Sequence, residues 1–374
     1  MVTAVRHLGP NWYASVMGTA IVATAGAALP LRLPGLRTLC TAVWALSLLL
    51  LVALLCARAL HWRHHSDQAR AHLLDPATAP FYGCLAMALL AVGGGALTVG
   101  ADWIGTSAAV ALDAVLFSAG TVLGLAAAVV VPYLMAVGQK TDPAQATPVW
   151  LLPVVAPMVS AALGPLLVPH LPPGQARATL LLACVAMFGL SLLATLLMLP
   201  LVFARLLTGG PLPLALTPTL FLVLGPLGQS TTAVGKFADV APGVVAEPYS
   251  RGFDALAVLY GVPVMGFAVL WLVLATAHVL RARRHGMGFA MTWWAFTFPV
   301  GTCVTGSEAL ARHTGLVAYD VLAIGLYGVL VVAWGTAALY TVRGLVSGEL
   351  LAGPRPAPVA PRPARGRTTS GAVR

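Results

Sequence analysis

Long uncharged apolar runs, separated by short polar connections, recur along almost the whole chain. A membrane-spanning helix needs about 20 mostly apolar residues, and runs of this length predict ten spans. They lie at residues 11–30, 38–57, 80–100, 108–136, 147–168, 178–204, 212–235, 252–279, 287–306 and 315–342. The pattern therefore predicts an all-α membrane protein whose transmembrane domain occupies residues 1–349.

The first run also fits a cleaved signal peptide, because Arg6 and His7 precede it and the small residues of AGAALP end it. Its length and the nine apolar runs behind it favour a retained helix.

Composition supports a membrane protein: 59% of the residues are hydrophobic and only 9% are charged, too few to cover a soluble domain of this size. A net charge of +10 in a soluble protein would suggest nucleic acid. Here the cations follow the topology instead: with the N-terminus inside, fifteen of the 21 Lys and Arg residues fall on the inner side. Since cytoplasmic loops carry this excess, both termini are predicted to be cytoplasmic in the plasma membrane, and no nucleic-acid partner is expected.

The C-terminal residues 350–374 are rich in Pro, Arg and Ser and cannot form a core. We predict a disordered, basic cytoplasmic tail that rests on anionic lipid.

Residues that weaken a helix recur near the middle of the odd-numbered spans. They are Gly18, Gly94, Pro157, Pro226 with its neighbour Gly225, and Pro299. Taking one residue from each span, the intervals are 76, 63, 69 and 73 residues. A period of about seventy matches one helical hairpin with its loops, so five hairpins related by rotation about the membrane normal are predicted. The alternative is composition alone, because Gly and Pro are common in membrane helices and the even spans contain Pro132, Pro200 and Pro263.

Bends at membrane depth bear on function, since irregular backbone is tolerated there only beside protein or a water-filled cavity. Pro299 removes the helical donor from the carbonyl of Ala295, and Pro226 does the same to Leu222. The helix that starts after each bend presents a positive end, which favours anions. Five bends at one depth therefore indicate a pathway.

Ionisable residues within the spans are few. Asp113 is the plausible intramembrane acid and the possible titratable residue of a proton-linked carrier. Lys236, Asp254, Glu308 and Asp320 lie near the outer ends of spans, where we expect them to shape a vestibule or to pair with one another. This scarcity favours a weakly binding passage over a tightly coupled carrier, because conduction requires weak binding.

One motif suggests an enzyme. The segment HWRHH, with His61, His64 and His65, has the spacing of the histidine boxes of membrane di-iron desaturases, and imidazoles can ligate iron. The other histidines form no second box, so a polar cytoplasmic loop is the simpler interpretation. The five cysteines contain no CxxC pair, and the motifs of ATPases, zinc proteases and esterases are absent. The sequence therefore predicts no catalytic residue, no metal, no cofactor and no enzyme.

Four segments resemble the tellurite-resistance/dicarboxylate transporter family. They are NWYASVMGTAIVA in the first span, LLPVVAPMV in the fifth, LGPLGQ in the seventh and WWAFTFPVG in the ninth. The family includes bacterial tellurite-resistance channels, plant slow-type anion channels, and fungal malate and sulfite transporters. The resemblance implies ten helices in five hairpins, with the odd helices around a central pore and the even ones outside, in a homotrimer.

The resemblance also implies that a phenylalanine of the ninth helix closes the pore, and the matching residue is Phe298, beside the bend at Pro299. The implied function is passage of small inorganic or organic anions across the lipid bilayer. A proton-linked exporter of C4-dicarboxylate, sulfite or tellurite is the alternative function, and ordinary core packing is the alternative role of Phe298. The physiological anion and the gating signal stay open.

Overall fold

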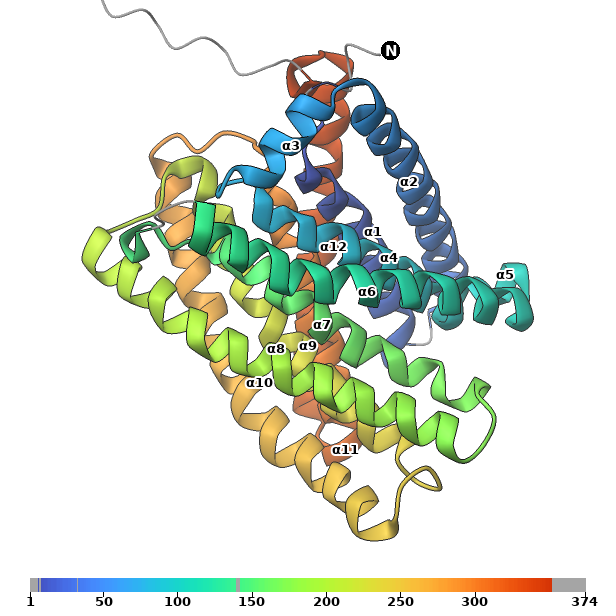
Figure 1. The fold of residues 1–374 in the computed structure, drawn as a ribbon. Helices are drawn as coiled ribbons and strands as arrows, with labels where there is room; N and C mark the ends of the chain where they lie inside the picture. The colour runs from blue at the N-terminus through green and yellow to red at the C-terminus, as the bar shows by residue number, and fades with distance from the viewer. Residues whose placement is uncertain (1–5, 7, 32, 139–141, 352–374) are drawn as a thin grey trace, which may run out of the picture.

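A computed structural model describes residues 6, 8–31, 33–138 and 142–351, so the predicted tail lies almost entirely outside the described residues. Within these ranges every regular element is a helix (Figure 1). Seven helical stretches are long and apolar enough to cross a membrane: Leu36–His64, Ala79–Ile104, Thr106–Val137, Pro148–Leu166, Gln175–Gly209, Glu247–Arg284 and Val317–Val346. The prediction of an all-helical membrane protein is confirmed.

The three other predicted spans coincide with helical segments outside this set of seven. Residues 11–30 correspond to α1, residues 212–235 to the 3₁₀ helix η8 followed by α9, and residues 287–306 to the 3₁₀ helix η9 followed by α11. Several helices run further than the apolar runs; α2, for example, continues to His64. The helix persists there because backbone hydrogen bonding does not require an apolar side chain.

Five inner segments form the centre of the molecule. They are α1 (Tyr13–Ala28), α4 (Tyr82–Gly95), α7 (Leu151–Leu163), α9 (Leu224–Val240) and α11 (Phe298–Thr314). In α4 and α7 apolar or small residues occupy every face, as expected of helices surrounded by protein. Each inner segment contacts two others, in the order α1, α4, α7, α9, α11 and back to α1. The inner segments therefore close into a ring.

Five longer helices cover this ring. They are α2 (Leu36–His64), α6 (Thr106–Gly138), α8 (Gln175–Gly209), α10 (Glu247–Arg284) and α12 (Val317–Val346). Each packs against the inner segment that precedes it in the chain. Only 22–33% of their apolar windows is buried, against 78% and 83% for the stretches containing α4 and α7. Their outward Leu and Val side chains form extensive apolar surface, which suits contact with lipid.

The helix type changes near several of the predicted bends. The π-helical turn η3 (Ala96–Gly100) continues α4 directly, and the short α5 (Ala101–Ile104) follows it. η8 (Leu214–Val223) becomes α9 two residues before Pro226, and η9 (Met291–Phe296) ends three residues before Pro299, with Thr297 between η9 and α11. A proline in the first turn of a helix is well tolerated, because its missing N–H has no partner there in any case.

The connections gather at two ends of the bundle. One, which we call the α5 end, carries α5 and the links 29–35, 164–174, 241–246 and 315–316. The opposite end carries the short helix α3 (Ser66–Leu74), and we call it the α3 end (Figure 1). Leu8 and Leu351 line one groove, so the first and last described parts of the chain lie together at the α3 end.

A glycine sets the spacing of α9 and α11. A Cβ at Gly228 would lie 2.5 Å from the amide nitrogen of Cys303, against the α11 backbone, whereas a Cβ at Gly225 would meet nothing within 4 Å. We expect Gly228→Ala to lower the free energy of unfolding by about 1–3 kcal/mol, because it overpacks the contact. Gly225→Ala is the matched control and should be neutral or stabilising by up to ~1 kcal/mol. Thermal unfolding of the purified protein measures both, and equal unfolding temperatures for the two variants would contradict the assignment.

Candidate functional site

A cavity of about 300 Å³ lies within the ring at the α5 end. We call it the vestibule. Every inner segment, or the turn that continues it, lines this space: Thr24 of α1, Thr98 of η3, Leu163 of α7, Thr232 of α9 and Thr305 of α11. A cavity shared by all five members of a closed ring lies at the centre of that ring.

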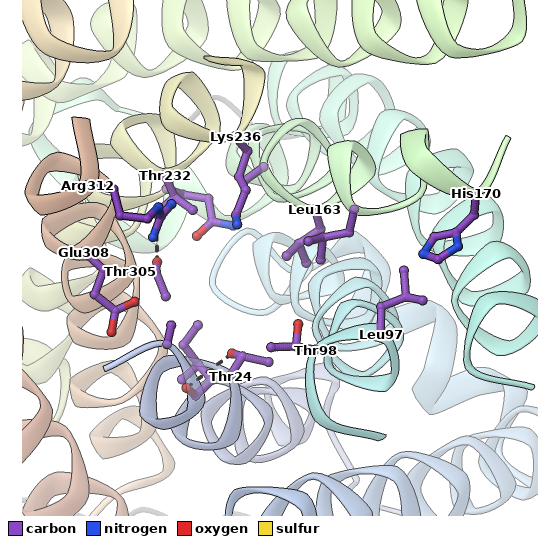
Figure 2. Close-up of a pocket in the computed structure, with 15 residues that line it drawn as sticks. Thr24, Leu97, Thr98, Leu163, His170, Thr232, Lys236, Thr305, Glu308 and Arg312 are labelled. Atoms are coloured by element: carbon purple, nitrogen blue, oxygen red, sulfur yellow. Dashed lines mark hydrogen bonds between the residues drawn. The ribbon is translucent and has the colours of Figure 1, made fainter. Parts of the chain in front are cut away.

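Two helices supply most of the polar side chains of the vestibule. Gln229, Thr232 and Lys236 come from α9, and Thr305, Glu308 and Arg312 come from α11. Each set has the spacing i, i+3, i+7, so each lies along one face of its helix. The hydroxyls of Thr232 and Thr305 are 2.7 Å apart and join the two faces. Figure 2 shows Lys236, Glu308 and Arg312 reaching into the same space.

A carboxylate beside the vestibule partly neutralises its cations. Asp239 Oδ2 lies 3.6 Å from Lys236 Nζ and 3.3 Å from an Arg312 guanidinium nitrogen. The other oxygen, Oδ1, lies 3.3 Å from His313 Nε2. Asp239 is outside the lining of the vestibule. The pairs therefore hold the two cations in position while leaving them facing the cavity.

Two buried oxygens of the vestibule have no hydrogen-bond partner in the described part of the chain. They are Oε1 of Gln229 and Oε1 of Glu308, on side chains that are 3% and 4% exposed. Buried polar atoms are nearly always hydrogen-bonded, and each exception requires an explanation. Both side chains line the vestibule, so each places a buried, unpartnered oxygen beside that cavity.

A second, much smaller cavity lies within the ring toward the α3 end. Its volume is about 20 Å³, enough for roughly one water molecule. All five inner segments or their extensions contribute again: Met17 of α1, Cys84 of α4, Leu152 of α7, Leu222 of η8 and Phe298 of α11. Phe298 is 3% exposed. The centre of the ring is therefore wide and polar at one end, and narrow and apolar where Phe298 lies.

The neighbouring phenylalanine has a different environment. Phe296 is half-buried and packs edge-on against Phe221, with ring centroids 4.8 Å apart, and against Trp293 at 5.9 Å. It does not line the small cavity. The break at Thr297 thus separates one phenylalanine that packs on η8 and η9 from one that faces the ring centre.

The predicted bend residues occupy different environments, and their role as pore bends stays a prediction. Gly18 lies in uninterrupted α1, where an added Cβ would meet Trp294 at 2.9 Å, and Pro157 lies within uninterrupted α7. Gly94 faces Leu163 of the vestibule, since a Cβ added at Gly94 would lie 3.1 Å from Leu163 Cδ2. Pro299 lines the small cavity, whereas Pro226 lines a groove between α8, α9 and α10.

Asp113 is buried, but it contacts α4 from the covering helix α6. A Cβ on Gly93 would lie 2.5 Å from Asp113 Oδ1, and Asp113 lines neither cavity. The acid that faces the vestibule is Glu308 instead. Of the four outer charges expected to shape a vestibule, Lys236 and Glu308 line it, whereas Asp254 and Asp320 do not. The shared i, i+3, i+7 spacing of polar residues in α9 and α11 is the sequence signal that marks this site.

The histidines of the HWRHH segment gather at the α3 end. The rings of His61 and His72 stack with centroids 5.6 Å apart, and those of His61 and His65 are 6.2 Å apart. Within the ranges described, no group of three or more His, Cys, Asp or Glu side chains is placed to hold a metal ion.

An all-helical membrane fold with a charged cavity at the centre of a closed ring is the architecture of a membrane channel or transporter. The family model described as voltage-dependent anion channel (SLAC1) matches residues 7–342. The chain belongs to this family, as the four motifs predicted.

Similar proteins include an uncharacterized transporter of Methanocaldococcus jannaschii, 26% identical over 351 residues, which span 93% of this chain and 96% of the relative. The sulfite efflux pump SSU1 of Arthroderma otae is 27% identical over 334 residues, which span 85% of this chain and 86% of the pump. The corresponding pump of Trichophyton rubrum is 26% identical over 344 residues, with the same two shares. These relatives are transport proteins, and the family supports anion transport as the activity of this chain.

Proposed function

We propose that the protein passes small anions across the membrane along the axis of its ring, with ten helices arranged as five hairpins. The observation that carries this proposal is the pair of cavities, each lined by all five inner segments. Membership of the anion channel family supports it. Small inorganic or organic anions are the partners, and both termini are cytoplasmic in the plasma membrane.

Phe298 is the gate in this proposal. Its ring fills the narrow part of the passage, where about 20 Å³ of space is left. An apolar constriction excludes a hydrated ion because it cannot replace the ion's water. Rotation of the ring away from the axis opens the passage, and the break at Thr297 (φ −97°, ψ −79°) sets the direction in which the ring points.

The vestibule selects the sign of the ion. Lys236 and Arg312 bring positive charge to a cavity surrounded by protein, where electrostatic interactions are stronger than in water. The hydroxyls of Thr24, Thr98 and Thr305 line the same cavity, but each donates its proton to a backbone carbonyl of its own helix, so the two cationic side chains supply the main contacts to the anion. Few and scattered contacts of this kind allow rapid release.

The alternative is proton-linked export of an oxyanion such as sulfite, a C4-dicarboxylate or tellurite. The sulfite efflux pumps that match 85% of the chain favour this alternative. It requires a titratable side chain along the passage, a requirement that Glu308 meets by its position in the vestibule.

By family resemblance we propose a homotrimer. The broad apolar faces of the covering helices, with exposed residues such as Leu197, Leu259 and Val346, provide surface for both lipid and neighbouring subunits.

Currents through the purified protein in planar lipid bilayers test this function. With a salt gradient, a reversal potential close to that of the anion is expected, and it should change with the anion supplied. A reversal potential that follows the proton gradient instead would favour the coupled exporter. Absence of any anion current or flux would contradict anion transport.

A further inference from the structure

Glu308 has an environment that simple ion pairing does not explain. It is a carboxyl group on the wall of a cavity that also contains Lys236 and Arg312, yet its Oε1 is buried with no partner in the described residues. Its two cationic neighbours pair with Asp239 instead. The carboxyl group thus lies at the cavity wall with one buried oxygen that no hydrogen bond satisfies.

We propose that Glu308 holds one proton whenever the vestibule holds an anion, so that the vestibule takes up the anion and the proton together. This inference rests on the proposed function, and it identifies the group that links anion occupancy to pH. The proton comes from the solution at the α5 end and returns to that same solution when the anion leaves the vestibule, so charge and atoms balance.

The charge count of the site carries the argument. Lys236 and Arg312 contribute two positive charges and Asp239 one negative charge. When Glu308 is ionised the sum is zero, and the carboxylate repels an anion in the same cavity. When Glu308 is protonated the sum is one positive charge, which a monovalent anion neutralises. Anion and proton therefore stabilise each other.

Hydrogen bonding leads to the same conclusion. A protonated Glu308 presents an O–H, Lys236 and Arg312 present N–H groups, and the amide of Gln229 presents two more N–H donors. These four side chains line one cavity. These donors fit the oxygens of an oxyanion, whereas an ionised Glu308 would add a second acceptor to the unpartnered Oε1 of Gln229.

Some of the other ionisable groups around Glu308 attract its negative charge, and others repel it. Arg312 of α11 and Lys236 of α9 attract its negative charge, whereas Asp320 of α12 repels it, and Tyr327 of α12 also interacts with it. His313 and Asp239 lie behind the cations as a pair. His170 lines the vestibule on the side away from Glu308 (Figure 2). Neither α1 nor α10 contributes an ionisable side chain to the lining of the vestibule.

Nitrate flux into proteoliposomes between pH 5 and pH 9.5 tests the proposal. Nitrate stays unprotonated throughout this range, so a linked proton belongs to the protein. Where Glu308 is ionised in the empty site, wild-type flux at low nitrate concentration should fall by about tenfold per pH unit, because one proton is bound with each anion. Glu308→Gln keeps the shape and the neutral charge of protonated Glu308. Its flux should stay constant with pH to within roughly twofold, near the value that the wild type shows at low pH.

Two variants serve as controls. Glu308→Asp keeps a titratable group and should keep the pH dependence, whereas Glu247→Gln removes an exposed carboxylate of α10 and should behave as wild type. A pH dependence in Glu308→Gln equal to that of the wild type would overturn the inference and leave the proposed function intact. Absence of nitrate flux in the wild type at every pH would contradict the proposed function itself.

A direct measurement keeps the proposal testable if Glu308→Gln does not fold. Nitrate binding to the wild-type protein is measured by calorimetry at pH 9.5 in two buffers of different ionisation enthalpy. The difference between the two binding enthalpies, divided by the difference between the buffers' ionisation enthalpies, should correspond to uptake of about one proton per nitrate bound. Binding with no proton uptake would overturn the proposal.

Discussion

Replacing Phe298 by alanine should raise the basal anion conductance at least several-fold. Phe298 lines a cavity of only about 20 Å³, and its phenyl group is the largest side chain of α11 that faces this cavity. Removing the ring widens an apolar constriction, and the barrier to a hydrated ion falls steeply with width. Currents in planar bilayers at a fixed chloride gradient measure the change.

Phe296→Ala is the matched control, since it removes the same ring two residues away. Phe296 packs against Phe221 and Trp293 and not at the centre of the ring of helices. Its loss should therefore affect stability and leave the basal conductance near the wild-type value. Equal currents in the two variants would show that Phe298 packs in the core and does not gate.

Replacing Lys236 by glutamine should lower anion conductance about tenfold at low salt. A unit charge at ~4 Å contributes roughly 4 kcal/mol at an effective dielectric constant of ~20. Asp239, 3.6 Å from Lys236 Nζ, cancels part of this field, and a net loss of about 1.4 kcal/mol corresponds to tenfold. The conductance at several anion concentrations, compared with wild type, measures the effect.

Arg251→Gln provides the control for Lys236→Gln. Arg251 also starts near the α5 end, but its side chain is 72% exposed and pairs with Glu247 on the surface of α10. Solvent and salt screen such a charge, so its removal should change the conductance by less than about twofold. A similar loss in both variants would mean that surface charge, rather than the vestibule, concentrates the anion.

Hydropathy alone located most of the helices, because the requirement for about 20 apolar residues leaves a clear pattern in the chain. The positions of the helix ends are less well predicted. The sequence predicts a span at residues 38–57, whereas α2 extends from Leu36 to His64. Arg58 ends the apolar run, and the helix continues through polar residues such as Arg63 and His64. The ten-helix count and the hairpin arrangement remain predictions.

The candidate site was only partly predictable. Phe298 was identified from the motif around Pro299, and it lies at the narrow cavity. The sequence predicts Asp113 as the possible titratable residue because it is an acid within a span. In the structure it packs between α6 and α4. Hydropathy reports the depth of a residue and says little about which face of the helix it occupies. For this reason the sequence predicts only that Glu308 shapes a vestibule or pairs with another charge, and it gives no sign of the unpaired oxygen.

Composition and motifs are properties of the linear chain, and they suffice to identify a helical membrane protein of the anion channel family. Two features emerge only from the packing of the helices: the closed ring of α1, α4, α7, α9 and α11, and the central cavity that Lys236, Glu308 and Arg312 share. Residues 236 and 308 are far apart in the chain, and close packing at Gly228 brings their helices together. Contacts of this kind depend on how the helices fit against one another, which no local pattern specifies.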